Sequence, residues 1–502
     1  MLPNLISPVF LIFTLKTINH DFYSHTVGTL SFVWLFIVHS LNAQKEKPNV
    51  LFISIDDLND WVGCLDGHPQ ALTPNIDKLA TKGLLFTNAH CQAPISGTSR
   101  ASIMTGLYPF QSGNYLQLED KHIKKSNSLT HKAIFMPDYF EQHGYKTMAV
   151  GKIYHNGDGA HTFDEYGGRF SWMGPKPEER INFDPAWMGH PNGTQTDWGV
   201  YPGADSLMTD FKSAAWAVNK LKQNHEKPFF LAVGFVRPHV PWYTSKKWFD
   251  LFPLDEVQLP PYNPSDFNDI PAMAEKVAAV PMMPTTEWLK SRNEWKEPVQ
   301  AYLACIAFVD HQVGKVLNAL ENSPYANNTI IVLWSDHGYH LGEKNRFAKQ
   351  ALWREDTRTV FMIHAPDKPS GEKNHSPLEL IDMYPTLTEL CGLPAYELGQ
   401  GKSLVPLMDT PGLQWETPAV SVYGKGNIAL TGTRYRLIQY EDGSQEFYDL
   451  ENDPNEWNNL AQSKRFFEEK AYLETFIPSA WSASSPHSAY NINEYFRNKP
   501  NN

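Results

Sequence analysis

The segment Asn49-Val50-Leu51-Phe52-Ile53-Ser54-Ile55 decides the fold of this 502-residue chain. It is a nearly unbroken apolar run, rich in β-branched residues, and it stops at two carboxylates, Asp56 and Asp57. A run of this length and composition is typical of a strand buried on both faces of a parallel sheet. We expect it to be one strand of a larger sheet, because similar runs recur at 147–150, 229–235 and 329–334.

Helical candidates separate these predicted strands. They span 73–82, where Pro74 takes a first-turn position, then 206–223 and 295–321. Alternating strands and helices predict an α/β fold with a mostly parallel sheet that helices cover on both faces. Two regions without clear periodicity, 159–198 and 254–297, are predicted to be long loops over the strand ends.

The pattern changes after about residue 410. Short alternating runs, separated by turn residues, occupy 419–423, 428–430, 435–440 and 446–450. They predict an antiparallel meander. A chain of 502 residues is long enough for two domains. We therefore expect a main domain at 44–410 and a smaller C-terminal antiparallel subdomain at 411–502.

The first 43 residues are predicted to be a signal peptide. Their apolar run at 30–38 is too short to cross a bilayer core of about 30 Å as a helix, and Ala43 suits cleavage before Gln44. We expect export to the periplasm or out of the cell, without stable membrane insertion. An uncleaved membrane anchor is the alternative.

Charge and cysteine content exclude several classes of protein. The net charge of −12 argues against nucleic-acid binding, which draws on clustered Lys and Arg. An anionic substrate would therefore need a local cluster of cations. The four cysteines have no CxxC pair, so they indicate neither a zinc site nor a disulfide framework, although one bridge is compatible with an oxidising compartment.

Titratable residues follow each of the four predicted strands: Asp56 and Asp57, Lys152 and His155, His239, and Asp336 and His337. Ligands of open α/β sheets bind beyond the carboxyl ends of the strands, so these positions favour a functional site. Adjacent carboxylates repel each other unless a cation lies between them, and hard divalent metals prefer oxygen ligands. A metal site is the resulting hypothesis. On spacing alone, a helix cap at Asp57 and a turn at Asp336 are equally compatible.

One motif makes the prediction more specific. Ser96-Gly97-Thr98-Ser99-Arg100, followed by Thr105-Gly106, resembles the C/S-x-P-S-R signature and Thr-Gly tail of the type I sulfatases of the alkaline phosphatase superfamily. The resemblance extends over most of the chain, through 55–58, 73–77, 237–239, 336–338 and 448–454. It is strongest for the iduronate-2-sulfatase-like branch, because of 151–155 and the segment 341–343 that leads to Lys349.

This resemblance implies an alkaline-phosphatase-like fold and a set of site residues. Ser96 would be oxidised to formylglycine by a serine-type maturase, and one hydroxyl of the formylglycine hydrate would attack sulfur. One calcium ion would be held by Asp56, Asp57, Ser96, Asp336 and His337. Lys152 and Lys349 would clamp the sulfate oxygens, and Arg100 would hold the formylglycine hydroxyl. His155 would take the proton of that hydroxyl, and His239 would protonate the leaving oxygen. Lys344 is a weaker candidate, for which a solvated surface role is equally compatible.

The family also implies the substrate class, namely a sulfated saccharide such as the algal polysaccharides ulvan and carrageenan, or a glycosaminoglycan. This chain departs from the commoner pattern at two positions, with Ser96 in place of Cys and Thr98 in place of Pro or Ala. Two rival hypotheses follow. Unmodified Ser96 could attack phosphate or phosphonate esters, or the chain could be an inactive carbohydrate-binding protein. The complete set of cations and carboxylates at the strand ends favours the sulfatase.

Overall fold

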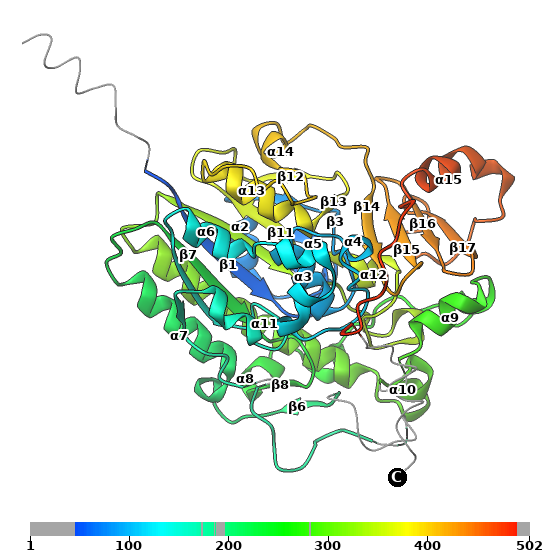
Figure 1. Cartoon of the computed structure of the whole chain (residues 1–502). Helices are drawn as coiled ribbons and strands as arrows, with labels where there is room; N and C mark the ends of the chain where they lie inside the picture. The colour runs from blue at the N-terminus through cyan, green and yellow to red at the C-terminus, as the bar shows by residue number, and fades with distance from the viewer. Residues whose placement is uncertain (1–45, 172–173, 185, 187–195, 281–282, 489–502) are drawn as a thin grey trace, which may run out of the picture. The chain divides into compact units, whose positions relative to one another are not determined.

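The computed structural model describes residues 46–171, 174–184, 186, 196–280 and 283–488, and the predicted signal peptide lies outside them (Figure 1). The main sheet has eight strands in the order β12-β2-β11-β9-β1-β7-β4-β5. Its central strands are β9 (Thr329–Ser335), β1 (Asn49–Ile55), β7 (Phe229–Phe235) and β4 (Lys146–Gly151). The flanking strands are β12 (Glu372–Asn374), β2 (Leu84–Phe86), β11 (Phe361–His364) and β5 (Glu165–Tyr166).

The four central strands run parallel, as the sequence predicts. β1 pairs in parallel with both β7 and β9, and β4 pairs in parallel with β7. β1 and β7 begin and end at the predicted residues, whereas β4 and β9 are slightly longer. Only β11 is antiparallel to its neighbours within the described part of this sheet. The carboxyl ends of four adjacent strands therefore share one edge.

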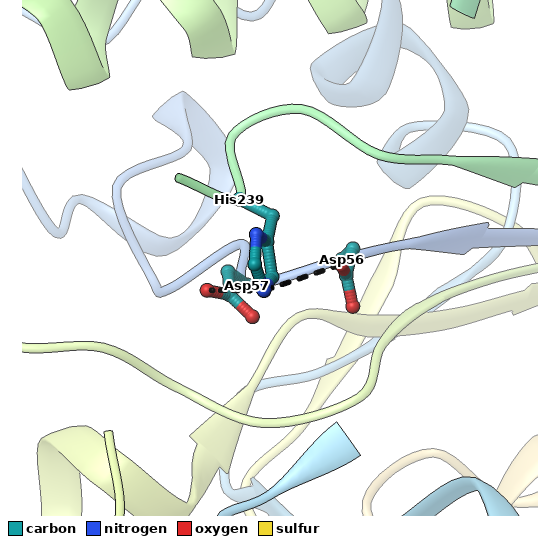
Figure 2. A group of neighbouring side chains, drawn as sticks. All are labelled: Asp56, Asp57 and His239. Atoms are coloured by element: carbon teal, nitrogen blue, oxygen red, sulfur yellow. Dashed lines mark ion pairs between the residues drawn. The ribbon is translucent and has the colours of Figure 1, made fainter. Parts of the chain in front are cut away.

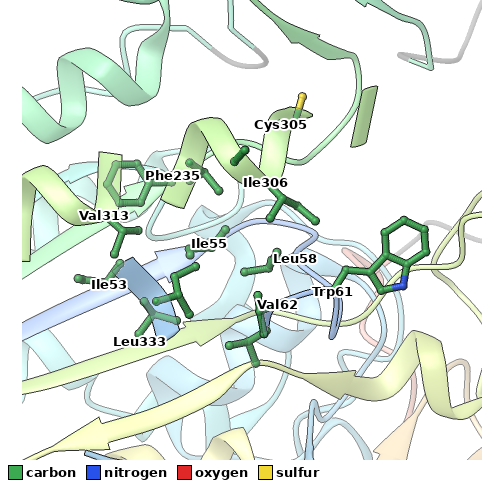
Figure 3. Packing of buried hydrophobic residues seen from close by; sticks show 14 of the residues in the cluster. Ile53, Ile55, Leu58, Trp61, Val62, Phe235, Cys305, Ile306, Val313 and Leu333 are labelled. Atoms are coloured by element: carbon green, nitrogen blue, oxygen red, sulfur yellow. The ribbon is translucent and has the colours of Figure 1, made fainter. Parts of the chain in front are cut away.

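Helices cover both faces of the sheet. Leu51, Ile53 and Ile55 of β1 point into a core formed with α2 (Pro74–Ala80), α7 (Thr209–Leu221) and α11 (Lys296–Glu321). Figure 3 shows this core, where Ile53, Ile55 and Leu333 pack below Ile306 and Val313 of α11. Val50 and Phe52 point the other way, toward α3 (Ser96–Thr105), α6 (Met136–Gln142), α13 (Met383–Leu390) and α14 (Val405–Asp409). The alternation explains why β1 is apolar at almost every position.

The predicted C-terminal meander is present. β14 (Ala419–Val422), β15 (Ile428–Thr431), β16 (Tyr435–Gln439) and β17 (Gln445–Asp449) pair antiparallel in chain order. α15 (Phe467–Glu474) follows them. Tyr423 and Ala429 share a buried cluster with Ile95 and Trp353, which precede this sheet in the chain. The residues just before Ser96 are thus packed against the C-terminal sheet.

Small elements complete the described chain. A three-stranded sheet consists of β10 (Arg358–Thr359), β3 (Ala89–His90) and β13 (Leu378–Glu379), and β6 (Trp198–Val200) pairs with β8 (Trp242–Thr244). The remaining α-helices are α4 (Pro109–Ser112), α5 (Ser128–Lys132), α8 (Lys246–Phe249), α9 (Ala272–Ala278), α10 (Thr286–Arg292) and α12 (Arg354–Thr357). Because α9 and α10 lie within 254–297, the prediction of one long loop there is wrong.

The four cysteines lie in the described part of the chain, and all are free thiols, so the one disulfide that the sequence permits is not formed. Among the described residues, no helix combines the length and the apolar character that crossing a membrane requires.

A buried carboxylate connects two helices. Pro74 begins α2, and the side chain of its N-cap residue Thr73 accepts no hydrogen bond from the helix backbone. Asp310 of α11 caps the helix instead. Its carboxylate accepts hydrogen bonds from the backbone N–H groups of Asn75 at 3.1 Å and Ile76 at 2.8 Å. Burial raises the pKa of Asp310 to about 6, although these hydrogen bonds oppose the shift.

This pKa predicts the pH dependence of stability. The carboxyl ionises near 3.8 in the unfolded chain and near 6 in the folded chain, so the folded state binds more protons between these values. The contribution of Asp310 to stability should therefore fall as the pH rises through this window. We expect the difference in melting temperature between the wild type and Asp310→Asn to decrease from roughly pH 4 to 7. A pH-independent difference in differential scanning fluorimetry would contradict this assignment.

The central core gives a second prediction. Leu333 lies on β9 and is fully buried, two residues before the end of the strand. Leu333→Ala should lower the free energy of unfolding by about 2–5 kcal/mol, because it removes apolar contacts and leaves a cavity. Leu413→Ala is the matched control, since Leu413 is 41% exposed. Urea denaturation followed by tryptophan fluorescence measures both variants. Equal losses of unfolding free energy would show that the buried Leu333 contributes no more to stability than the exposed Leu413.

Candidate active site

Four loops leave the shared edge of the sheet and bring titratable side chains together. Asp56 and Asp57 follow β1, and Asp336 follows β9 at the adjacent position. All three carboxylates are buried. The backbone N–H of Asp57 donates to Oδ1 of Asp336 at 3.1 Å, with Asp57 in the left-handed region at a φ of 60°. This contact holds the ends of two parallel strands in a fixed relation.

Ser96 lies at the N-terminus of α3, and the sheet edge surrounds its hydroxyl. Its Oγ is 3.3 Å from Oδ1 of Asp56 and 3.0 Å from Nε2 of His337. Nδ1 of His337 is 2.9 Å from the carbonyl oxygen of Gly338, which can only accept a hydrogen bond. In its neutral form the His337 ring would therefore carry the proton on Nδ1 and present the Nε2 lone pair to the site. The positive end of the α3 dipole also favours negative charge at Ser96.

Arg100, one turn further along α3, forms hydrogen bonds with residues that follow three different strands. Its guanidinium donates to Oδ1 of Asp56 at 3.2 Å and to Oδ2 of Asp336 at 3.0 Å. It also donates to the carbonyl oxygens of Lys152 at 2.8 Å and Ile153 at 2.9 Å, after β4. The fixed geometry of a guanidinium suits this arrangement, which no lysine could reproduce. Arg100 thus anchors the carboxylates beside residue 96, and its contact with the formylglycine hydroxyl stays a prediction.

Two lysines add positive charge. The ammonium group of Lys152 contacts Oδ2 of Asp56, and that of Lys349 contacts Oδ1 of Asp57. Burial lowers the pKa of Lys152 to about 8, although Asp56 opposes the shift. Burial alone would raise the pKa of Asp56, but Lys152, His239 and Arg100 outweigh it and hold that pKa well below its ordinary value. Three cations therefore balance three carboxylates.

His239 faces the same carboxylates from the loop after β7 (Figure 2). Its Nε2 is 4.0 Å from Oδ2 of Asp56 and 3.9 Å from Oδ2 of Asp57. Its Nδ1 is 2.7 Å from the carbonyl oxygen of Val240, so the neutral ring again presents the Nε2 lone pair to the site. Burial lowers the pKa of His239 well below its ordinary value, and Lys349 adds to this shift.

His155 is connected to the Ser96 motif by Gln117, a residue that the sequence did not indicate. Its ring contacts the side-chain amide of Gln117, whose Oε1 accepts the backbone N–H of Gly97 at 2.8 Å. Burial lowers the pKa of His155 well below its ordinary value, and Lys152 adds to the shift. No motif or strand end pointed to Gln117, since it lies in an irregular stretch after α4.

The weaker candidate Lys344 lies elsewhere. Its ammonium group pairs with Asp266 at 3.0 Å and donates to the carbonyl oxygen of Glu456. It also lies over the rings of Trp353 and Tyr448. Of the two alternatives for Lys344, the solvated surface role is wrong, because the side chain is buried against Asp266 and the C-terminal sheet.

The donor set fits a divalent cation. Within the described residues, two overlapping groups have ligand atoms within 4.8 Å of one another: Asp56, Asp57 and His239, and Asp57, Asp336 and His337. Oδ2 of Asp57 is buried without a hydrogen-bond partner. Such an atom is costly unless a cation compensates it, and carboxylate oxygens are preferred ligands of hard metals. The structure therefore brings together all the residues that the sequence proposed as metal ligands, and it adds His239.

The mostly parallel sheet and its charged edge agree with the alkaline-phosphatase-like fold that the Ser96 motif predicts. The family model "Sulfatase" matches residues 48–393, and "N-sulphoglucosamine sulphohydrolase, C-terminal" matches residues 342–478. The chain belongs to the sulfatase family and is a sulfuric ester hydrolase. This family assignment confirms the resemblance read from the Ser96 motif.

Similar proteins support the assignment. A sulfatase of Formosa agariphila is 47% identical over 462 residues, covering 90% of this chain and 91% of the relative. Human iduronate 2-sulfatase is 30% identical over 402 residues, covering 70% of each chain. A structure solved with its substrate D-glucosamine-2-N,6-O-disulfate has a TM-score of 0.66 at 20% identity, covering 86% of this chain and 96% of the other.

The site predicts metal-dependent stability. A divalent cation added to chelator-treated protein should raise the melting temperature, because a ligand that binds only the folded state stabilises it. Asp57→Asn should abolish most of this increase, since it weakens a carboxylate shared by both candidate groups. Asp250→Asn, at an exposed surface carboxylate, should leave the increase unchanged. An equal response in all three proteins would place cation binding elsewhere.

Proposed function

We propose that this sulfatase hydrolyses sulfate monoesters of a sulfated saccharide, using formylglycine made from Ser96 and one calcium ion. The observation that carries the proposal is the position of Ser96 Oγ, between Asp56 and His337 and at the end of α3. A nucleophile at residue 96 would act at the positive end of the α3 dipole and near the ammonium groups of Lys152 and Lys349, which can stabilise negative charge that develops in the reaction.

The residues that would hold the calcium ion are Asp56, Asp57, Asp336 and His337, with the modified Ser96. A bound divalent cation supplies Lewis-acid polarisation of oxygen, and formylglycine supplies the hydroxyl of its hydrate as a nucleophile. The carboxylate majority among the ligands favours a hard cation over zinc, which prefers nitrogen and sulfur.

The remaining side chains of this chain handle charge and protons. Lys152 and Lys349 would bind the sulfate oxygens, and their donors already reach the carboxylates beside Ser96. A sulfate monoester has little proton affinity, so the leaving alcohol oxygen needs a proton more than the sulfate does. His239 would give that proton from Nε2, the atom that faces the site, after taking up a second proton there, because the neutral ring holds its own proton on Nδ1. His155, held by Gln117, would take the proton of the nucleophile.

The relatives support the proposed substrate class. The name of iduronate 2-sulfatase refers to a sugar, and the solved structure contains a glucosamine disulfate as that protein's substrate. An algal polysaccharide such as ulvan or carrageenan, or a glycosaminoglycan, is the proposed source of the ester. Activity outside the cytoplasm is part of the same proposal, and the run at 30–38 with Ala43 supports it.

Mass spectrometry of the Ser96 peptide tests the proposal most directly. Protein made with a serine-type maturase should show the loss of two hydrogens at Ser96, and protein made without it should not. Sulfate release should require this modification and should fall at least about a thousandfold in Ser96→Ala, because the nucleophile is lost. An unmodified Ser96 in fully active protein would exclude formylglycine.

Matched sulfate and phosphate esters of one alcohol separate the rival hypotheses. A sulfatase should favour the sulfate ester, whose single charge suits the balanced site, whereas a phosphatase-like enzyme should favour the doubly charged phosphate. Turnover of neither ester, together with retained glycan binding, would identify an inactive binding protein.

A further inference from the structure

The segment 116–120, here called the strap, lies between α3 and the loop after β4 and contacts both. At its start, the carbonyl oxygen of Leu116 accepts the hydroxyl of Thr98. At its end, the carboxylate of Asp120 accepts three consecutive backbone N–H groups, those of His155 at 3.0 Å, Asn156 at 2.8 Å and Gly157 at 2.9 Å. The strap therefore fixes the backbone on both sides of the site.

Gln117 stands at the centre of the strap. Its Oε1 accepts the N–H of Gly97, the residue next to Ser96, at 2.8 Å. Its Nε2 lies 2.6 Å from Nε2 of His155 and 3.1 Å from Nδ1. One amide thus joins the backbone beside the nucleophile to the imidazole. Among side chains, only Asn and Gln offer a carbonyl acceptor and an N–H donor in one planar group.

Gly97 makes this contact possible. A Cβ built on Gly97 would overlap Oε1 of Gln117 and approach the carbonyl oxygen of Leu118 at 3.0 Å. Any larger residue at position 97 would push the amide away from the α3 N-terminus. In this chain, the glycine of the Ser96 motif is therefore needed to leave room for Gln117, and not to permit an unusual backbone conformation.

We propose that Gln117 is a positioning residue that sets the distance and orientation of His155 relative to residue 96. The inference rests on the proposed function, in which His155 takes a proton from the nucleophile at that residue. Gln117 acts through His155 and is not assigned a contact with the substrate. Its amide would keep the imidazole aligned while the substrate enters and leaves.

A double-mutant cycle tests the proposal with matured protein and a small aryl sulfate. Gln117→Met keeps the length of the side chain but removes both hydrogen bonds. It should lower kcat about tenfold or more, with KM changed less than about twofold, because misplacement of a catalytic group affects the reaction step. In the His155→Ala background the same substitution should cost little further activity, since the residue through which it acts is gone.

Two more variants make the test specific. Gly97→Ala should reproduce the loss of kcat from the other side of the contact. Gln223→Met, at an exposed position after α7, is the matched control and should behave as the wild type. Turnover is divided by the fraction of residue 96 that mass spectrometry finds oxidised, so that an effect of Gly97→Ala on maturation does not count as an effect on catalysis.

The opposite results would overturn the proposal. Equal losses from Gln117→Met with and without His155 would indicate a purely structural role, and a rise in KM alone would indicate a contact with the substrate. The imidazole ¹⁵N resonances give a readout that needs no turnover. Gln117→Met should shift the His155 signals and Gln223→Met should not. If the wild type releases no sulfate, the proposed function fails, whereas these resonances still decide whether Gln117 holds His155.

Discussion

The charge balance at the sheet edge is the constraint on which the rest of the structure depends. Asp56, Asp57 and Asp336 are buried, and each would be very costly in that position without compensation. Arg100, Lys152 and Lys349 provide the opposite charges, each from a different element. A buried ion pair is a weak source of stability. Removing either partner is nevertheless strongly unfavourable, because it leaves the other charge buried without compensation. The arrangement is therefore better explained by chemistry than by stability.

This constraint accounts for the parallel sheet around it. Parallel strands place all their carboxyl ends on one edge, so β1, β4, β7 and β9 can each contribute a loop to one small volume. The apolar residues of β1 alternate between two helical layers and hold the strand from both sides. The cost of the buried charges is offset by this large core, to which β1 contributes on both faces just before it ends at the two adjacent carboxylates.

The sequence predicted the fold well where the signals were local. The runs at 49–55 and 229–235 matched β1 and β7, and the C-terminal alternation matched the meander. The strand-end rule also brought the charged residues to one edge without any knowledge of distances. The sequence could not predict α9 and α10, because the irregular composition of 254–297 has no clear period. Nor could it distinguish a surface Lys344 from the buried partner of Asp266, which is 78 residues distant.

Gln117 illustrates the remaining limit. Its two contacts join residues 20 and 38 positions away, and neither contact produces a periodic or compositional pattern in the sequence. The Ser96 motif identifies the nucleophile, and the strand ends identify its charged neighbours, but the motif does not say what holds His155 in place. The absence of a side chain at Gly97 is the one trace that the contact leaves within the motif. Such a residue becomes visible only when the backbone beside the nucleophile and the imidazole are placed in the same structure.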